Sequence, residues 1–246
     1  MILAEENRLE SVERFKQLNF SQNKELQEIV ALAAEICNVP VAMITLLDED
    51  TNRFLVCQGL DITESPREIS FCQYTVLQEG VLEIADTTKD ERFITNPMVT
   101  NAPGVRFYAG APLCANDGGN IGSLCVLDAQ PHTLTHIQHQ MLSVLSRQVM
   151  YLMEIEYSKY LTQEQRYEIE IQNQALMKIA YIQSHEFRGP VASILGLMSL
   201  IKEENYTPPP HLLHMMEDVV KALDEKIQTV VTYSATKYSE LQKILV

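Results

Sequence analysis

The stretch "VRFYAGAPLCANDGGNIGSLCVLD", residues 105–128, decides the fold of the N-terminal part of this 246-residue chain. Its two ends, 105–113 and 121–128, are rich in β-branched, aromatic and small apolar residues, which is typical of strands. The segment between them contains Asp-Gly-Gly, a signal for a tight hairpin turn. The stretch therefore predicts two neighbouring antiparallel strands.

The flanking sequence predicts that these strands belong to a larger sheet covered by helices. Further strand-like runs occupy 41–50, 53–60 and 81–86. Apolar residues recur at helical spacing over 6–37, with a break near 19–23, and again from Thr135 onward. Residues 71–80 have the length of one short helix. This order predicts an α+β domain with one mainly antiparallel sheet flanked by helices.

The chain changes character after about residue 152. Residues 154–183 contain no Gly or Pro and are rich in Glu, Gln and Lys, which predicts a continuous helix. The segment "ENYTPPP", 204–210, separates it from a second helix that ends near Tyr233, so the C-terminal part is expected to be an αα-hairpin. The chain is therefore expected to consist of the α+β domain over 1–155, a helical linker over 156–178 and a hairpin over 179–246.

Each helix of the hairpin carries an apolar stripe at the 4-3-4-3 spacing of bundle cores. An isolated pair of helices cannot enclose a core. Two hairpins that pair into a four-helix bundle would bury both stripes, so we expect a homodimer. The stripes consist of Phe187, Val191, Ile194, Met198 and Ile201 on the first helix, and Leu212, Met216, Val219, Leu223, Ile227 and Val230 on the second.

Composition excludes several kinds of partner. The net charge is −14 and no basic face is evident, which argues against nucleic acid and against anionic membranes. No apolar run reaches the ~20 residues that span a bilayer, and no signal-peptide pattern opens the chain, so a cytoplasmic location is expected. Five cysteines, none in a C-x-x-C pair, predict buried thiols and no metal site.

The histidine of "SHEFRGP", 184–190, lies nearly opposite the apolar stripe on a helical wheel and should face solvent. A neutral imidazole such as that of His185 has a nucleophilic lone pair at physiological pH. The carboxylate of Glu186 can hold the proton on the other ring nitrogen. Pro190 lacks an N–H, which leaves the Glu186 carbonyl without its helical donor and predicts a local bend.

The segment "SHEFRGPVASILGLMSLI", 184–201, resembles the phosphoacceptor box of two-component sensor histidine kinases. The resemblance implies that His185 accepts a phosphoryl group from ATP and passes it to a response-regulator receiver domain. Glu186 would act as acid/base, and Arg188 and Pro190 belong to the same box. Gly189 stands where the family usually has Thr or Asn, which implies weak phosphatase activity.

The ATP-binding catalytic domain of that family is not evident, because the chain contains no Gly-rich phosphate loop. We therefore expect no cofactor in this chain. ATP would act only through a catalytic domain that was trimmed, lost or supplied in trans by another protein.

Residues 69–128 resemble the GAF small-molecule sensor domains, with "RFYAGAPL" and "IGSLCVLD" as the most specific part. The resemblance implies a pocket between the sheet and the loop-rich segment 86–108. Its expected lining residues are Phe71, Cys72, Phe93, Arg106 and Tyr108. The ligand is unknown, since neither a bilin-attachment nor a cyclic-nucleotide signature is evident.

The sequence is compatible with three functions. The leading one is a dimeric signalling protein in which a GAF sensor is coupled to phosphotransfer through His185. The alternative is a non-catalytic adaptor or pseudo-kinase, in which the GAF domain and the hairpin mediate ligand sensing and assembly only. A methionine sulfoxide reductase of the GAF type is disfavoured by the cysteine spacing and by the added hairpin.

Overall fold

The computed structural model describes residues 2–244, with side chains described over 5–181 and 185–232. The chain divides into two compact units, 1–162 and 163–246. Residues 1 and 245–246, at the ends of the predicted segments 1–155 and 179–246, lie outside the described residues, as does the side chain of Ser184. The boundaries predicted at 155 and 178 stay predictions.

The N-terminal unit contains a six-stranded sheet in the order β3-β2-β1-β6-β5-β4, and every neighbouring pair is antiparallel. Residues 105–128 contain the β5–β6 hairpin, in which Tyr108 faces Leu127 and Gly110 faces Cys125. The prediction of an antiparallel α+β domain is therefore confirmed. The strands are β1 Val41–Leu47, β2 Thr51–Gln58, β3 Glu64–Pro66, β4 Leu82–Ile84, β5 Phe107–Cys114 and β6 Asn120–Asp128.

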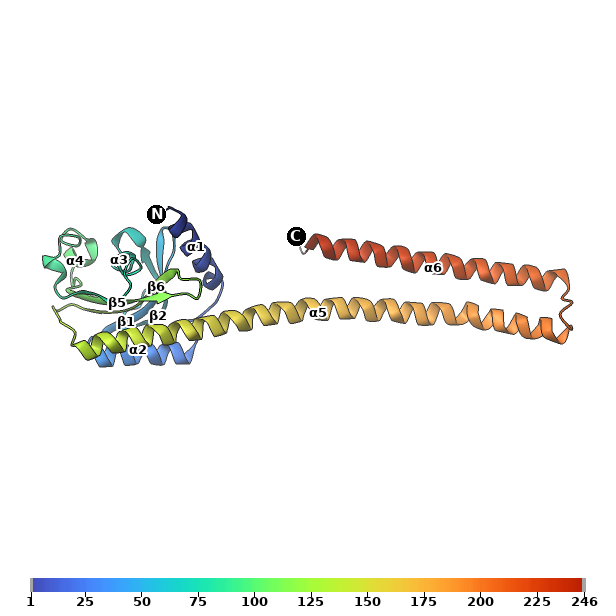
Figure 1. Cartoon of the computed structure of the whole chain (residues 1–246), viewed down its shortest axis with the longest axis horizontal. Helices are drawn as coiled ribbons and strands as arrows, with labels where there is room; N and C mark the ends of the chain where they lie inside the picture. Colours follow the sequence, from blue (N-terminus) through green and yellow to red (C-terminus); the bar gives the residue numbers. More distant parts are fainter. Residues whose placement is uncertain (1, 245–246) are drawn as a thin grey trace. The chain divides into compact units, whose positions relative to one another are not determined.

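Helices cover both faces of this sheet (Figure 1). The predicted break in the first helical segment is confirmed, and the side chain of Asn23 caps the second helix by accepting from the Leu26 N–H. The helices are α1 Ile2–Lys16, α2 Lys24–Cys37, α3 Cys72–Thr75, α4 Pro97–Thr100, α5 His136–Glu203 and α6 Pro210–Ile244, with short 3-10 turns at Arg67–Ile69 and Thr87–Lys89.

The helix predicted over 71–80 is wrong in length, because only Cys72–Thr75 is α-helical. The side-chain amide of Asn120 donates to the carbonyls of Val76 and Gln78, at 2.9 and 3.1 Å. These bonds occupy acceptors that a longer helix would use for its own N–H groups. Leu77, two residues after the end of the helix, is 76% exposed, so a continued helix would have no apolar face to bury.

Alternation along β1 separates two apolar cores. Ala42, Ile44 and Leu46 belong to the core shared with α1, α2 and the first part of α5. Met43 and Leu47 belong to the core on the other face, beneath α3 and α4. This period of two is what allows one sheet to carry a helical layer on one face and a ligand-sized cavity on the other.

The start of α5 is fixed by a reciprocal capping box. The Thr135 N–H donates to Gln138 Oε1 at 2.8 Å, and the Gln138 N–H donates to Thr135 Oγ1 at 3.3 Å. From there α5 continues without interruption to Glu203 and contains Pro190 in its interior. The predicted linker 156–178 and the first hairpin helix are therefore parts of one helix.

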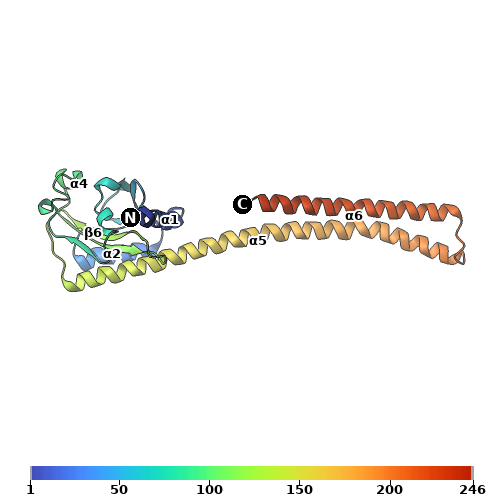
Figure 2. The same ribbon diagram turned by 45° about the horizontal axis from the view of Figure 1, so that its top comes forward.

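In the C-terminal unit α6 runs antiparallel beside the second half of α5 (Figure 2). The helix extends to Ile244, beyond the end predicted near Tyr233. Ile201 and Val230 of the predicted stripes are buried in the hairpin, while Val191 and Met198 are 44% and 45% exposed. Among the described residues, no helix is apolar over enough of its length to cross a membrane.

Candidate functional site

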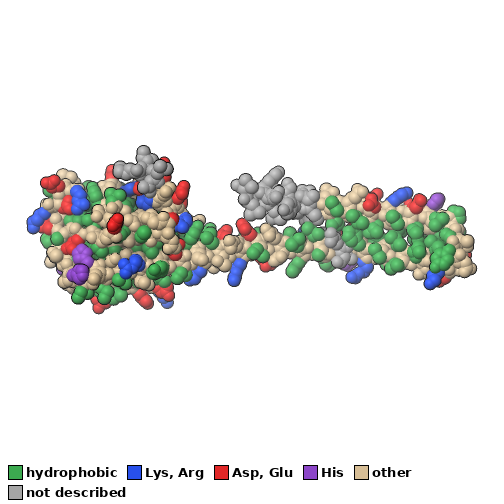
Figure 3. All heavy atoms as spheres, in the orientation of Figure 1, with side chains coloured by type: hydrophobic (Ala, Val, Ile, Leu, Met, Phe, Trp, Pro, Cys, Tyr) green, Lys and Arg blue, Asp and Glu red, His purple; other side chains and the backbone are tan. Residues whose placement is uncertain are grey.

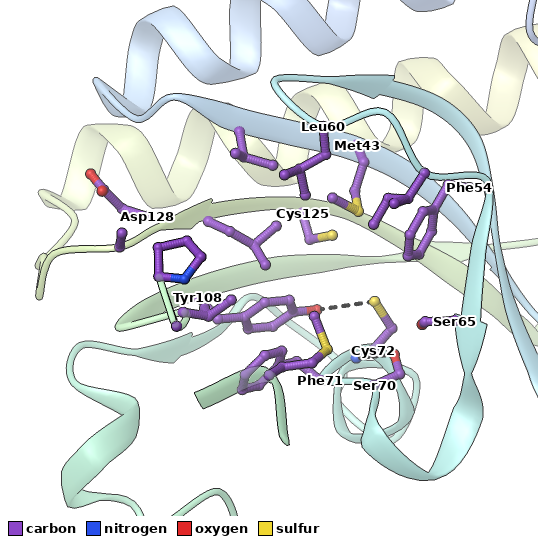
Figure 4. Close-up of a pocket in the computed structure, with 18 of the residues that line it drawn as sticks. Met43, Phe54, Leu60, Ser65, Ser70, Phe71, Cys72, Tyr108, Cys125 and Asp128 are labelled. Carbon is purple, nitrogen blue, oxygen red and sulfur yellow. Dashed lines mark hydrogen bonds between the residues drawn. The ribbon is translucent and has the colours of Figure 1, made fainter. Parts of the chain in front are cut away.

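A cavity of about 350 Å³ lies on the sheet face opposite α2 and α5 (Figure 4). Its volume falls within the usual range of small-molecule sites. Strands β1, β2, β3, β5 and β6, the start of α3 and the loop around α4 supply its walls. The lining consists of Pro40, Val41, Met43, Asn52, Phe54, Leu60, Ile62, Ser65, Ser70, Phe71, Cys72, Pro97, Met98, residues 101–105, Tyr108, Cys125, Leu127, Asp128 and Ala129.

Three of the five side chains predicted for the pocket line this cavity: Phe71, Cys72 and Tyr108. The rings of Phe71 and Tyr108 stack at 5.1 Å between centroids. Within the described part of the chain, Phe93 and Arg106 do not line the cavity but support its wall. The ring of Phe93 packs on Phe71 at 4.6 Å, and Arg106 Nη1 donates to a backbone carbonyl of α4 at 2.8 Å. A role in ligand contact stays a prediction for all five.

The chemistry of the lining restricts what can bind. Of the lining residues that the structure describes, none is Lys, Arg or His, and the single charged side chain is that of Asp128. Figure 4 shows Asp128 at the end of the cavity away from Cys72 and Ser65. A phosphate or carboxylate would lose its hydration in this cavity without gaining a cationic partner, so the lining favours a neutral ligand.

Two polar atoms at the inner end of the cavity have no hydrogen-bond partner. Asn52 is 2% exposed and its Oδ1 is unpaired, as is the buried Oγ of Ser65. The two residues face each other across β2 and β3. An unpaired buried polar atom costs about 1–3 kcal/mol, so a ligand that donates to Asn52 Oδ1 would recover part of that cost. Sequence reasoning missed both residues, although an Asn inside a strand is an unusual choice.

The same end of the cavity contains two thiols, Cys72 on α3 and Cys125 on β6. The sulfur of Cys72 accepts from Asn52 Nδ2 at 3.5 Å and from the Tyr108 hydroxyl at 3.6 Å. Thr75 Oγ1 lies 2.6 Å from that hydroxyl. Cys72 is therefore the common acceptor of two side-chain donors within a buried site.

The pKa values of the two thiols are shifted in opposite directions. Interaction with the Cys125 thiol is the main cause that lowers the pKa of Cys72 to about 5, against the opposing effect of burial. The interaction with Cys72 and burial together raise the pKa of Cys125 well above its ordinary value. Burial and the neighbouring Cys72 also raise the pKa of Tyr108. Cys72 is therefore the more acidic of the two thiols, and the Tyr108 hydroxyl donates to its sulfur.

The C-terminal unit places His185 on the exposed surface of α5, as its helical position predicted. Its ring lies 5.6 Å from the ring of Tyr181, measured between centroids. Glu186 Oε2 lies 3.4 Å from Lys226 Nζ of α6, and the same ammonium donates to the Glu186 carbonyl at 3.4 Å. That carbonyl is the acceptor that Pro190 deprives of its helical donor. The proline is thus partly compensated by a side chain from the second helix.

An α+β domain with long helices on one face of an antiparallel sheet, and short helices over an apolar cavity on the other, belongs to the class of small-molecule sensor folds. Residues 23–152 match the GAF domain family, and the chain belongs to that family. The chain is 43% identical over 127 residues to a cyclic di-GMP phosphodiesterase of Pseudomonas aeruginosa, which covers 52% of this chain and 22% of that protein. The match therefore spans about a fifth of the relative's length.

Solved structures with a similar fold include the GAF domain of an Acinetobacter phosphoenolpyruvate-protein phosphotransferase. It is 18% identical, with a TM-score of 0.48, and the match covers 63% of this chain and 95% of that one. A free methionine-R-sulfoxide reductase of Neisseria meningitidis, solved with its substrate, is 18% identical with a TM-score of 0.45, over 56% of this chain and 80% of that one. At these TM-scores the similarities carry no ligand and no activity over to this chain.

Proposed function

We propose that this chain is a homodimeric signalling protein in which a neutral small molecule, bound in the GAF cavity, controls phosphotransfer at His185. The single observation that carries the sensing part is the apolar cavity whose inner end presents two unpaired polar atoms, Asn52 Oδ1 and Ser65 Oγ. Continuity of α5 supports the coupling, because this one helix packs its first part on the sheet and contains the histidine further along.

Phosphotransfer is supported by the placement of the side chains around His185. An acceptor histidine has to meet two other proteins, a kinase domain and a receiver domain, and an exposed imidazole on a helix can do so. The Glu186 carboxylate, which lies beside His185 in the sequence, is oriented by the Lys226 ammonium at 3.4 Å. This arrangement supports Glu186 as the group that keeps the imidazole in its nucleophilic form.

Dimer formation is supported by apolar side chains that the hairpin leaves exposed. Figure 3 shows hydrophobic side chains along both helices of the C-terminal unit. Val191, Leu195 and Met198 on α5 are 44–64% exposed, and Ile227 on α6 is 42% exposed. A second hairpin would cover this surface, which a single pair of helices cannot bury.

The experiment that tests phosphotransfer incubates the chain with a histidine-kinase catalytic domain and labelled ATP, or with a phosphorylated receiver domain. We expect acid-labile label on the wild type and none on His185→Gln. His214→Gln is the matched control, because His214 is also an exposed helix histidine, and it should be labelled like the wild type. Equal labelling of His185→Gln, or no label on the wild type from any donor, would instead favour the adaptor function.

Dimerisation is tested separately by sedimentation. Leu195→Glu places a charge on the exposed apolar surface of the hairpin and should shift the protein to monomer at micromolar concentration. Leu77→Glu is the control, because Leu77 is 76% exposed on the GAF domain and lies outside the hairpin. A wild-type chain that sediments as a stable monomer contradicts the dimer.

A further inference from the structure

The thiol pair in the cavity is more than an apolar part of the wall. Cys72 and Cys125 are 3% and 1% exposed, yet both line the same cavity (Figure 4), and each shifts the pKa of the other. Structural thiols are usually surrounded by apolar groups, which raise the pKa of the thiol, as burial does for Cys37. Cys72 has the opposite surroundings, since the side chains of Asn52 and Tyr108 both donate to its sulfur.

The cavity determines which reagents can reach this sulfur. Leu60 and Ile62 at its rim are each 44% exposed, whereas Phe71 and Cys72 at its inner end are almost fully buried. A reagent therefore has to be small enough to enter a space of about 350 Å³. It also has to be neutral, because the described lining offers no cationic side chain to an anion.

Asn52 provides the geometry for one class of reagent. Its Nδ2 donates to Cys72 Sγ at 3.5 Å, so its unpaired Oδ1 lies close to the same sulfur. A hydroperoxide has one O–H donor directly attached to the oxygen that a thiolate attacks. A hydrogen bond from that O–H to Asn52 Oδ1 would satisfy the buried oxygen and hold the peroxide beside the sulfur.

We propose that Cys72 is a peroxide-reactive residue and that Cys125 is its resolving partner. The Cys72 thiolate attacks one oxygen of a small neutral hydroperoxide, a sulfur–oxygen bond forms and the oxygen–oxygen bond breaks. The sulfur loses two electrons, the leaving oxygen takes a proton and departs as water or an alcohol, and Cys72 becomes a sulfenic acid. The Cys125 thiol then attacks this sulfur, a disulfide forms and water leaves. This step goes beyond reversible ligand binding and does not depend on phosphotransfer at His185.

The test treats the full chain with hydrogen peroxide and follows the cysteines by mass spectrometry without reduction. We expect a Cys72–Cys125 disulfide, with the loss of two hydrogens. Cys125→Ser should stop the reaction at the sulfenic acid, which dimedone traps on Cys72. Cys72→Ser should leave Cys125 reduced. Cys114→Ser is the control, because Cys114 is exposed and outside the cavity, and the disulfide should still form in it.

A second measurement distinguishes a Cys72 thiol whose pKa is lowered by donors to its sulfur from one that is only accessible to the reagent. Tyr108→Phe removes one donor to the sulfur, so the midpoint of the thiolate's ultraviolet absorbance against pH should rise by about one unit. The proposal is overturned if Cys114 is oxidised before Cys72 in the folded wild type, or if Tyr108→Phe leaves the midpoint unchanged. Either outcome leaves the His185 labelling experiment intact, so the two proposals fail independently.

Discussion

The hydrogen bond between Thr75 and Tyr108 provides a quantitative test of the buried network. Both residues are buried, at 0% and 1% exposure, and their oxygens lie 2.6 Å apart. Thr75→Val removes this bond but leaves the tyrosine hydroxyl with Cys72 as acceptor, and should cost about 1 kcal/mol. Tyr108→Phe removes both bonds of the hydroxyl and should cost about 2 kcal/mol. The double variant should also cost about 2 kcal/mol, because the shared bond is lost only once.

Hydrogen exchange of the β5 and β6 amides measures these differences, since the opening free energy of the sheet reports its local stability. Addition of the two single effects would give about 3 kcal/mol, so the coupling expected from the cycle is about 1 kcal/mol. Strict additivity would refute the bond between Thr75 and Tyr108. A larger cost for Thr75→Val than for Tyr108→Phe would refute the continuation of the network to Cys72.

Three further predictions concern other parts of the chain. Gly122→Ala would drive a Cβ into a carbonyl of β1 and should destabilise the domain by roughly 3 kcal/mol in urea unfolding, whereas Gly80→Ala, with open space around it, should not. The Arg8 guanidinium holds the pKa of Glu5 at about 2, below its ordinary 4.5, so stability present above that ordinary value is lost as pH falls toward 2. Glu5→Gln should therefore flatten the acid side of a thermal melting series. Pro190→Ala restores a helical N–H and should raise the melting temperature of the C-terminal unit through a gain of about 1–3 kcal/mol.

The fold could be predicted from sequence where its determinants are local. Residues 105–128 specify both strands and the turn that joins them, and the register of the hairpin follows from the turn. β3 could not be predicted, because it is three residues long and ends in Pro66, and it exists only through pairing with β2. The length of α6 was underestimated, since apolar spacing becomes weak after Val230 although nothing in the composition terminates the helix.

The candidate site depends on contacts between distant strands, which composition and periodicity do not specify. Cys125 on β6 and Asn52 on β2 come close to Cys72 only because β6 and β2 are the two neighbours of β1 in the sheet. An alternating pattern identifies which residues share a face of one strand, but not which strand becomes its neighbour. The resemblance to GAF domains therefore located Cys72, whereas the side chains that make its sulfur distinctive became visible only in the assembled sheet.

Gly110 has no evident role in the sequence, but in the folded domain it leaves room for the Tyr108 hydroxyl. In the sequence it is one of several small residues in "FYAGAPL" and predicts nothing beyond a close-packed strand. In the sheet it lies two positions from Tyr108 on the same face, and a Cβ at this position would collide with the tyrosine hydroxyl and press on Thr75 Oγ1. The missing side chain leaves the space through which the hydroxyl reaches both Thr75 and Cys72. The reactivity proposed for Cys72 thus rests on a glycine that does not itself line the ligand cavity.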